Sequence, residues 1–199
     1  MRGSPATPAR FSVPVLVVAF AAQLLVPQVA FAQRPPPVIP QLELPQLTGV
    51  WYEIATTGSW WHRRCVSDTR YRFEPLKGRD LRASSICTTA RRVEEHRGRL
   101  RAAGNGDGRL SIRFAPGIFG WLPVTWADFW IIAAGEDFGW LLIGDDSLER
   151  LSILSRTVAL DEAAIARAVA VARRQGYDVE RLAPMPHPSG PSGLEPPKD

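Results

Sequence analysis

The chain has 199 residues, of which 45% are hydrophobic, and a formal net charge of +4 at pH 7. This length is sufficient for one domain with its own hydrophobic core. The net charge falls to +2 when Arg2 and Arg10 are left out, because no acidic residue accompanies them in residues 1–32. Such a small charge gives no argument for nucleic acid as a partner.

Residues 1–32 have the pattern of a secretory signal peptide. The two arginines are followed by a mostly apolar run at residues 11–26, and Ala30-Phe31-Ala32 forms a small-x-small cleavage site. We therefore expect the mature chain to begin near Gln33. An uncleaved membrane anchor is the alternative, although the apolar run is shorter than the roughly 20 residues that span a bilayer.

Two segments with unusual composition flank the central region. Residues 33–45 contain five prolines and are expected to form an extended lead-in. Residues 183–199 are dominated by Pro, Ser and Gly and are expected to form a disordered tail. The folded domain is therefore expected to span residues 46–182.

The central region is dominated by β-strand signals. Short runs recur at regular spacing with turn residues between them, which is typical of a sandwich or barrel. Residues 104–108 (Gly-Asn-Gly-Asp-Gly) predict a hairpin turn, and they lack the spacing and closing Glu of a calcium loop. Eight strands fit an up-and-down barrel with room for one ligand. The expected strands are residues 50–57, 66–74, 80–89, 92–102, 109–114, 128–134, 138–144 and 149–156.

One helix is predicted after the last strand. Asp161 is positioned as its N-cap, Arg173 and Arg174 lie in its last turn, and Gly176 provides a C-terminal stop. Its interior is rich in alanine with one apolar face, so we expect the helix to pack against the outside of the barrel. Residues 177–182 are expected to form a short strand.

Cys65 and Cys87 are expected to form a disulfide, because an exported chain meets an oxidising compartment. The strands 66–74 and 80–89 read as a hairpin, and folding this hairpin about Leu76 places the two cysteines opposite each other. A bulge or a different turn would shift this register by a residue or two. A loop of about 20 residues closed in this way is worth roughly 3 kcal/mol.

Three motifs resemble the signature motifs of the lipocalins. The first is Gly49-Val50-Trp51-Tyr52-Glu53-Ile54-Ala55, and the last is Leu151-Ser152-Ile153-Leu154-Ser155-Arg156-Thr157. The middle motif appears as Ala134-Gly135-Glu136-Asp137-Phe138. The resemblance covers about residues 44–182 and is strongest to the bacterial, apolipoprotein D-like branch. It implies an all-β fold, an eight-stranded up-and-down antiparallel barrel with a C-terminal α-helix packed on its outside.

Three positions depart from the family pattern. Ser152 replaces the usual Trp of the last motif, Val158 replaces a Pro, and Asp145 replaces the Pro after the seventh strand. The first change concerns the cavity wall, so the identity of the ligand cannot be carried over. Many relatives also have a lipid-bearing Cys at the cleavage site, which this chain lacks.

The resemblance implies that Gly49, Trp51 and Arg156 close the base of the barrel. A guanidinium group stacked on an indole is worth roughly 0.5–2 kcal/mol. The alternative is that Trp51 touches the ligand. The cavity wall is expected to consist of inward positions on alternating strands, each of which is otherwise a packing residue. A buried Glu53 would need a partner. The wall candidates are Glu53, Ala55, Tyr71, Phe73, Trp130, Ile132, Trp140 and Leu142.

The loops at 58–65, 89–97, 115–127 and 145–149 are expected to form the open rim. Aromatic residues beside arginines suit a molecule with a fatty tail and an anionic head, and tryptophan favours the membrane interface. The alternative is that the arginines are solvated and the apolar residues pack on one another. The mouth candidates are Trp60, Trp61, Arg63, Arg64, Arg91, Arg92, Phe119 and Trp121.

The sequence therefore predicts a periplasmic lipocalin that binds or carries a fatty acid or lysophospholipid and takes part in envelope lipid maintenance. We expect no cofactor, no metal and no catalytic residue, since the histidines are scattered and no G-x-S-x-G elbow occurs. Two alternatives remain open: an isomerase that uses a cavity thiol on a lipid-like substrate, and an envelope interaction protein. Association with the outer membrane is the alternative location, and the sequence does not specify an oligomeric state.

Overall fold

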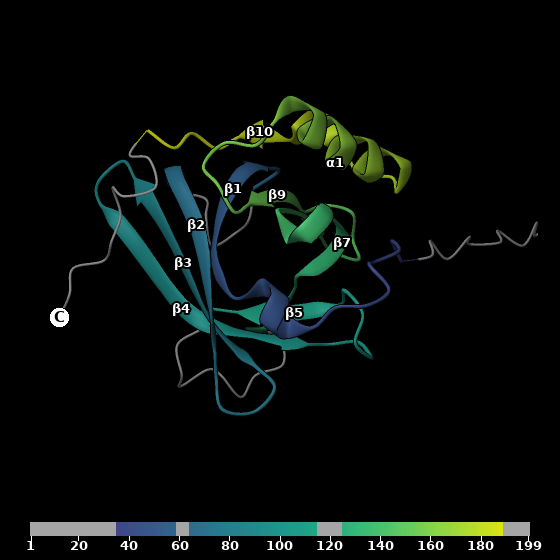
Figure 1. Ribbon diagram of the computed structural model, residues 1–199. Helices are drawn as coiled ribbons and strands as arrows, with labels where there is room; N and C mark the ends of the chain where they lie inside the picture. The colour runs from purple at the N-terminus through teal and green to yellow at the C-terminus, as the bar shows by residue number, and fades with distance from the viewer. Residues whose placement is uncertain (1–34, 59–63, 115–124, 189–199) are drawn as a thin grey trace, which may run out of the picture. The chain divides into compact units, whose positions relative to one another are not determined.

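The computed structural model describes residues 35–58, 64–114 and 125–188, so the predicted signal peptide lies outside the described residues. Nine strands form one antiparallel path in the order β6-β5-β4-β3-β2-β1-β9-β8-β7, and a tenth strand is added to β1 (Figure 1). The predicted all-β barrel with one helix is confirmed. The elements are η1 (Leu44–Leu47), β1 (Gly49–Thr56), β2 (Cys65–Pro75), β3 (Leu81–Thr89), β4 (Val93–Ala102), β5 (Leu110–Arg113), β6 (Ala127–Asp128), β7 (Trp130–Ala134), η5 (Glu136–Phe138), β8 (Trp140–Gly144), β9 (Leu151–Ser155), α1 (Glu162–Arg174), η6 (Val179–Arg181) and β10 (Ala183–Pro184).

The strand predicted at residues 128–134 is divided at Phe129. Its first part, β6, pairs with β5, and its second part, β7, pairs with β8. Phe129 N donates to Leu110 O at 3.0 Å and Ile131 N donates to Gly108 O at 2.8 Å, so the segment stays bonded to β5 and to the turn before it while it turns toward β8. The divided strand links the two ends of the sheet path and nearly closes the barrel, which is why the strand count exceeds the predicted eight.

The two ends of the barrel carry different connections. We call the end with the β1–β2, β3–β4, β5–β6 and β8–β9 connections the mouth, and the opposite end the base. The Pro-rich lead-in reaches the base in an irregular conformation. Its Leu42 is buried and donates its N–H to Gly106 O at 2.8 Å. Ile39 N donates to Ile131 O at 3.0 Å, so the lead-in packs on the barrel before η1 begins.

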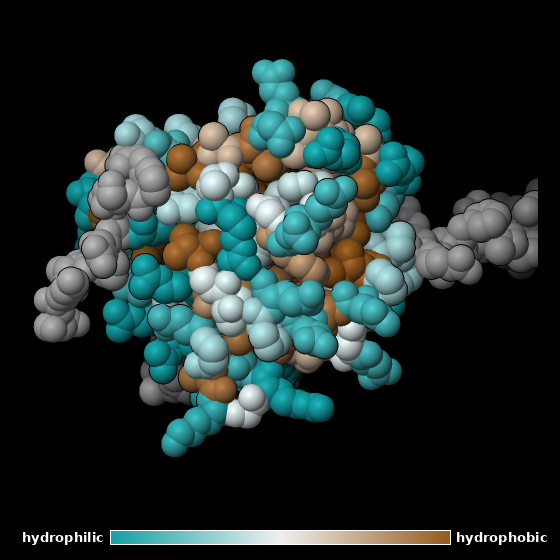
Figure 2. Space-filling view, viewed as in Figure 1, coloured by the Kyte–Doolittle hydropathy of each residue, from teal (hydrophilic) through white to brown (hydrophobic). Residues whose placement is uncertain are grey.

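Two hydrophobic clusters lie on opposite sides of the barrel wall. The interior cluster contains Trp51, Phe73 and Leu100, all at most 1% exposed. The second cluster lies between the strands β7–β9 and α1, which Figure 1 shows lying over this side of the barrel. Figure 2 shows apolar residues gathered beside the helix, whereas hydrophilic residues predominate over β4. The barrel therefore has one wall covered by the helix and one that faces solvent.

Helix α1 matches its prediction closely. Asp161 is the N-cap and accepts a hydrogen bond from Ala164 N at 2.8 Å. Gly176 follows the helix with a φ of +93°, a conformation that glycine adopts without strain. The residues turned to the barrel are Ala164, Ala168 and Ala172, and their small side chains let the helix lie close to the strands. Within the described residues no helix has the length and hydropathy of a membrane span.

The segment after α1 differs from the sequence prediction. Residues 177–182 were expected to form a strand, but they contain the 3-10 helix η6, and the strand β10 follows and pairs with β1. The predicted disordered tail also differs over residues 183–188. Met185 N donates to Ile54 O at 2.9 Å and Asp68 N donates to Pro186 O at 2.8 Å, so this segment bridges β1 and β2. Its prolines suit an extended segment that pairs through few N–H groups.

Candidate ligand-binding site

The base of the barrel is closed by a stacked pair. Arg156 Cζ lies 3.6 Å from the ring centroid of Trp51, which is fully buried. The guanidinium of Arg156 donates to the carbonyls of Gln46 and Thr48, both at 2.8 Å, and Trp51 Nε1 donates to Leu47 O at 2.7 Å. The pair thus fills this end of the barrel interior, and a groove of about 760 Å³ borders the base at Leu44, Leu76 and Asn105.

Backbone contacts bring all three signature motifs to this base. Arg156 N donates to Gly139 O at 3.0 Å, which joins the last motif to the turn that contains the middle one. Gly49 has a φ of +99°, and a Cβ at this position would lie 3.1 Å from Arg156 Nη1. The first motif therefore requires glycine both for its conformation and for the close approach of the guanidinium.

Above the base pair, three aromatic rings fill the interior. The ring centroids of Tyr71 and Phe73 are 6.2 Å apart, and both rings lie edge-on to Phe129, at 5.9 and 5.8 Å. A cavity of about 30 Å³, the volume of about one water molecule, lies beside Tyr71, Phe129 and Ser152. Tyr71 and Phe73 are inside the barrel, as the sequence analysis expected, and with Phe129 they form a floor beneath the mouth. We call these three residues the aromatic floor.

Four predicted wall residues lie on the other side of the wall. They pack in the cluster beneath α1, so the prediction that they line the cavity was wrong. Bulges between Glu53 and Ala55 in β1 and between Ile131 and Ala133 in β7 shift the alternation of inward and outward positions. All five residues of β8 are buried, so burial does not distinguish its two faces. The four residues are Ala55, Ile132, Trp140 and Leu142.

Other interior positions replace them. Ile131, Leu141 and Ile143 belong to the interior cluster, one position along the chain from the predicted residues. The remaining wall candidate, Trp130, is half-buried, and Arg109 Cζ lies 5.9 Å from its ring centroid. Phe129 was missed because the break between β6 and β7 leaves no mark in the sequence pattern.

A buried polar cluster lies above the aromatic floor. Ser152 Oγ donates to Glu53 Oε1 at 2.9 Å and lies 2.8 Å from the hydroxyl of Thr56. Burial raises the pKa of Glu53 from its ordinary value of 4.5 to about 7, although hydrogen bonds from Ser152 and Thr56 lower it. The partners of Glu53 thus include the hydroxyl groups of Ser152 and Thr56. Ser152 is the residue that departs from the family pattern, and this pairing gives it a role in the interior.

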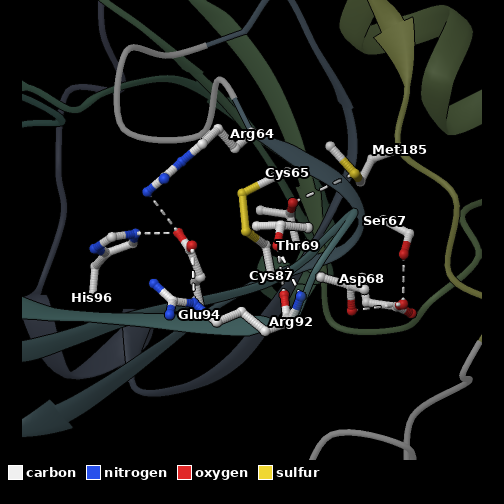
Figure 3. Close-up of a disulfide and its surroundings, with 12 residues drawn as sticks. Arg64, Cys65, Ser67, Asp68, Thr69, Cys87, Arg92, Glu94, His96 and Met185 are labelled. Atoms are coloured by element: carbon white, nitrogen blue, oxygen red, sulfur yellow. Dashed lines mark hydrogen bonds and ion pairs between the residues drawn. A yellow bond between two sulfur atoms is a disulfide. The ribbon is translucent and has the colours of Figure 1, made fainter.

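At the mouth, three basic side chains surround the carboxylate of Glu94 (Figure 3). Arg64 Nη2 lies 3.1 Å from Oε2, Arg92 Nε lies 3.3 Å from Oε1, and His96 Nε2 lies 3.9 Å from Oε2. The side chain of Glu94 is only 12% exposed, whereas both arginines are more than 70% exposed. Glu94 was not among the mouth residues predicted from the sequence, although its inward position opposite Cys87 follows from the alternation along β4.

The arginines also border a groove on the rim. The groove has a volume of about 600 Å³ and is lined by Arg64, Arg91, Arg92 and Glu94 together with apolar atoms of Val66. It is wide enough for a small polar group, and two of its three arginines are already engaged by Glu94. The other predicted mouth residues, Trp60, Trp61, Arg63, Phe119 and Trp121, lie outside the described residues.

The predicted disulfide between Cys65 and Cys87 is confirmed and lies beside this cluster (Figure 3). The two Cα atoms are 5.7 Å apart, but Cys65 is paired with Thr89 and not with Cys87 in the sheet. The hairpin turns about Gly78 and not about Leu76, because Pro75 pairs with Leu81, and two bulges in β2, on either side of Ser67, cancel only part of this offset. Asp68, which lies in the second bulge, has a φ of +56°. The bond therefore joins β2 and β3 diagonally and holds the mouth end of their hairpin together.

Comparisons with known proteins agree with this geometry. The family model described as "Lipocalin-like domain" matches residues 42–187. Temperature-induced lipocalin-1 of Arabidopsis thaliana is 28% identical over 169 residues, which cover 77% of this chain and 84% of that protein. The solved structure of H1 crustacyanin from the lobster Homarus americanus aligns with a TM-score of 0.57 at 16% identity, covering 79% of this chain and 92% of that chain. Insecticyanin from the tobacco hornworm Manduca sexta aligns with a TM-score of 0.60 at 13% identity, covering 76% of this chain and 84% of that chain.

Proposed function

Because the chain belongs to the lipocalin family, whose members generally bind small hydrophobic ligands, we propose that it binds and carries a fatty acid or lysophospholipid. The bound molecule occupies the mouth-end half of the barrel. The observation that carries this proposal is the sequence of environments along the barrel: a base filled by the Trp51–Arg156 pair, an aromatic floor, a buried polar cluster and a basic rim. A molecule with one apolar and one anionic end matches this order.

The floor supports a particular pose for the ligand. Phe73 and Leu154 are at most 1% exposed, so the lower interior is already filled by the chain itself. The acyl chain is therefore placed above Tyr71 and Phe129, where its binding has to widen the cavity of about 30 Å³. Each Å² of apolar surface removed from water there contributes about 25 cal/mol. Below pH 7, Glu53 is largely protonated, and a neutral carboxyl beside an acyl chain costs less than a carboxylate.

The rim supports recognition of an anionic head. The guanidinium groups of Arg64 and Arg92 are exposed and bind phosphate or carboxylate through paired hydrogen bonds. Glu94 competes with the ligand for both of them. Removal of this carboxylate should therefore strengthen the binding of an anionic head and leave a neutral head unaffected.

The experiment compares two ligands and two variants. Tryptophan fluorescence titrations should give at least tenfold tighter binding of a fatty acid than of the neutral monoacylglycerol of equal chain length, since a charge-assisted contact is worth about 1.5–3 kcal/mol. R64Q/R92Q should remove most of this difference, and E94Q should increase it. Equal affinities for both ligands in the unmodified protein would contradict recognition of the head by the basic rim.

The proposed location is the periplasm of a bacterial cell, after cleavage near Gln33, with outer-membrane association as the alternative. The Cys65–Cys87 bond supports an oxidising compartment. We further propose that the carried lipid serves maintenance of the envelope. Identification of Gln33 as the first residue of the exported protein would test the location, and an intact Met1 in a membrane fraction would contradict it.

The alternative of a cavity-thiol enzyme is less well supported. Such an enzyme needs a free thiolate, and both cysteines are joined in the disulfide. Non-reducing peptide mapping of the exported protein tests this point directly. Two free thiols would reopen the enzymatic alternative.

A further inference from the structure

The outer surface of β2–β5 concentrates positive charge away from the mouth. Six outward arginines on these strands lie near three acidic residues, Glu74, Asp80 and Glu95. This local excess of three positive charges is larger than the net charge of +2 that remains without Arg2 and Arg10. We call these six residues the arginine face: Arg72, Arg82, Arg97, Arg99, Arg101 and Arg113.

Three of these arginines stand in one row across neighbouring strands. Arg82 on β3 is paired with Arg99 on β4, and Arg99 is paired with Arg113 on β5. Side chains directly opposite on antiparallel strands are only about 4.5–5.5 Å apart at Cβ, and like charges in such pairs are destabilising. Arg99 has a like charge on both sides, and its nearest carboxylate oxygen, on Asp80, is 3.8 Å away. A layer of external negative charge would relieve this repulsion.

An aromatic side chain lies at the edge of the row. Trp126 is half-buried, and the guanidinium carbons of Arg101 and Arg113 lie 3.9 and 4.7 Å from its ring centroid. Stacking holds both guanidinium groups, and with them two positive charges, over the indole at this edge of the face. Tryptophan beside arginine is also the combination found at membrane–water interfaces.

We propose that the arginine face binds the surface of a bilayer containing anionic phospholipids. The arginines are spread over the outside of the wall on neighbouring strands, and the groove of about 330 Å³ beside Arg72, Arg82 and Arg97 also contains Glu74 and Glu95. This arrangement fits an extended array of phosphates better than one enclosed anion. The inference is independent of the proposed ligand, because none of these residues belongs to the interior or to the rim.

The test is vesicle co-sedimentation of the full exported chain. Phosphatidylcholine vesicles with and without phosphatidylglycerol are compared at low and high salt. We expect binding only to the anionic vesicles, with loss at high salt because exposed charges are screened. R99Q/R113Q should weaken partitioning roughly thirtyfold, since each arginine near an anionic surface is worth about 1 kcal/mol.

R64Q/R92Q is the matched control, because it removes the same charge at the mouth. It should leave vesicle binding within about twofold of the unmodified protein, whereas R99Q/R113Q should leave fatty-acid titrations unchanged. Arg99→Gln should also melt at the same temperature as the unmodified protein or higher, since it removes a repulsion. The same measurement on R99Q/R113Q, which should unfold in one cooperative transition, checks that the double variant is folded.

Three results would overturn the proposal. An equal loss in both double variants would mean that only the total charge matters. A loss confined to R64Q/R92Q would assign membrane contact to the mouth. Binding to soluble polyphosphate without binding to anionic vesicles would assign the face to a different class of partner.

Discussion

The two walls of this barrel differ in how clearly their sequences show which side faces inward. Along β4, the exposed residues Glu95, Arg97 and Arg99 alternate with more buried neighbours, because this wall has water on its outer side. Along β8, every residue from Trp140 to Gly144 is buried, because α1 covers the outside. Polar and apolar alternation identifies the interior only where one face of the sheet remains in water.

The comparison of the two walls predicts that both faces of β8 contribute about equally to the free energy of unfolding. Leu141 lies in the interior cluster and Leu142 lies beneath α1, and both are fully buried. Replacement of either leucine by alanine should lower the free energy of unfolding by about 2–5 kcal/mol. Urea denaturation of the two variants measures this. A nearly neutral Leu142→Ala would show that the helix contact is not part of the core and would break the comparison.

Glu53 lies on β1, between the two walls, and ties stability to pH. Its pKa is about 7 in the folded chain and near the ordinary 4.5 when unfolded. Between these values the folded state holds the proton and the unfolded state does not, so the free energy of unfolding falls as pH rises from 4.5 to 7 and then levels off. The full change is about 3 kcal/mol as an order of magnitude.

Glu53→Gln is the control for this dependence. The amide keeps the size of the side chain and does not titrate, so most of the fall in stability between pH 4.5 and 7 should disappear. Urea denaturation of both proteins at several pH values gives the comparison. An unmodified protein whose stability rises across this range would contradict the assignment of a protonated, buried Glu53.

The smallest expected effect concerns the helix that distinguishes the covered wall. Asp161→Ala removes the acceptor for Ala164 N and should cost about 1 kcal/mol. Asp161→Asn retains a capping oxygen and should cost less. Thermal unfolding measures both variants. Equal losses for Ala and Asn would mean that the charge at the helix N-terminus, rather than the hydrogen bond, stabilises α1.

The sequence was sufficient for most strand positions, for the capped helix and for the choice of disulfide partners. Each depends on local signals such as turn residues, Asp161 and the count of two cysteines. It was insufficient for the register of Cys65, because the hairpin turns about Gly78 and not about Leu76. It was also insufficient for the inward side of β7 and β8, because a bulge and burial on both faces leave no periodic signal. Glu53 in the first motif and Ser152 in place of the usual Trp were the sequence signals that marked the buried polar cluster.

Residues 183–188 show a different limit of sequence analysis. Their composition predicts disorder, yet the side chain of His187 is only 6% exposed, with Nε2 2.8 Å from Glu53 O and its ring against Tyr52. The contacts that hold this segment come from β1 and β2, more than a hundred residues earlier in the chain. Amino-acid composition describes only the segment itself, and it carries no information on contacts with strands as distant in the sequence as β1 and β2.

The central claim is that a lipid occupies the interior above the aromatic floor. Photo-crosslinking tests this claim most directly. A fatty acid with a photoreactive diazirine in its tail is bound to the exported protein and irradiated, and the residues that carry adducts are identified by peptide mass spectrometry. We expect adducts on residues such as Tyr71, Phe129 and Ser152, which surround the interior cavity above the floor. Adducts confined to α1 and to Trp140 or Leu142 beneath it would contradict the claim, because they would place the ligand outside the barrel.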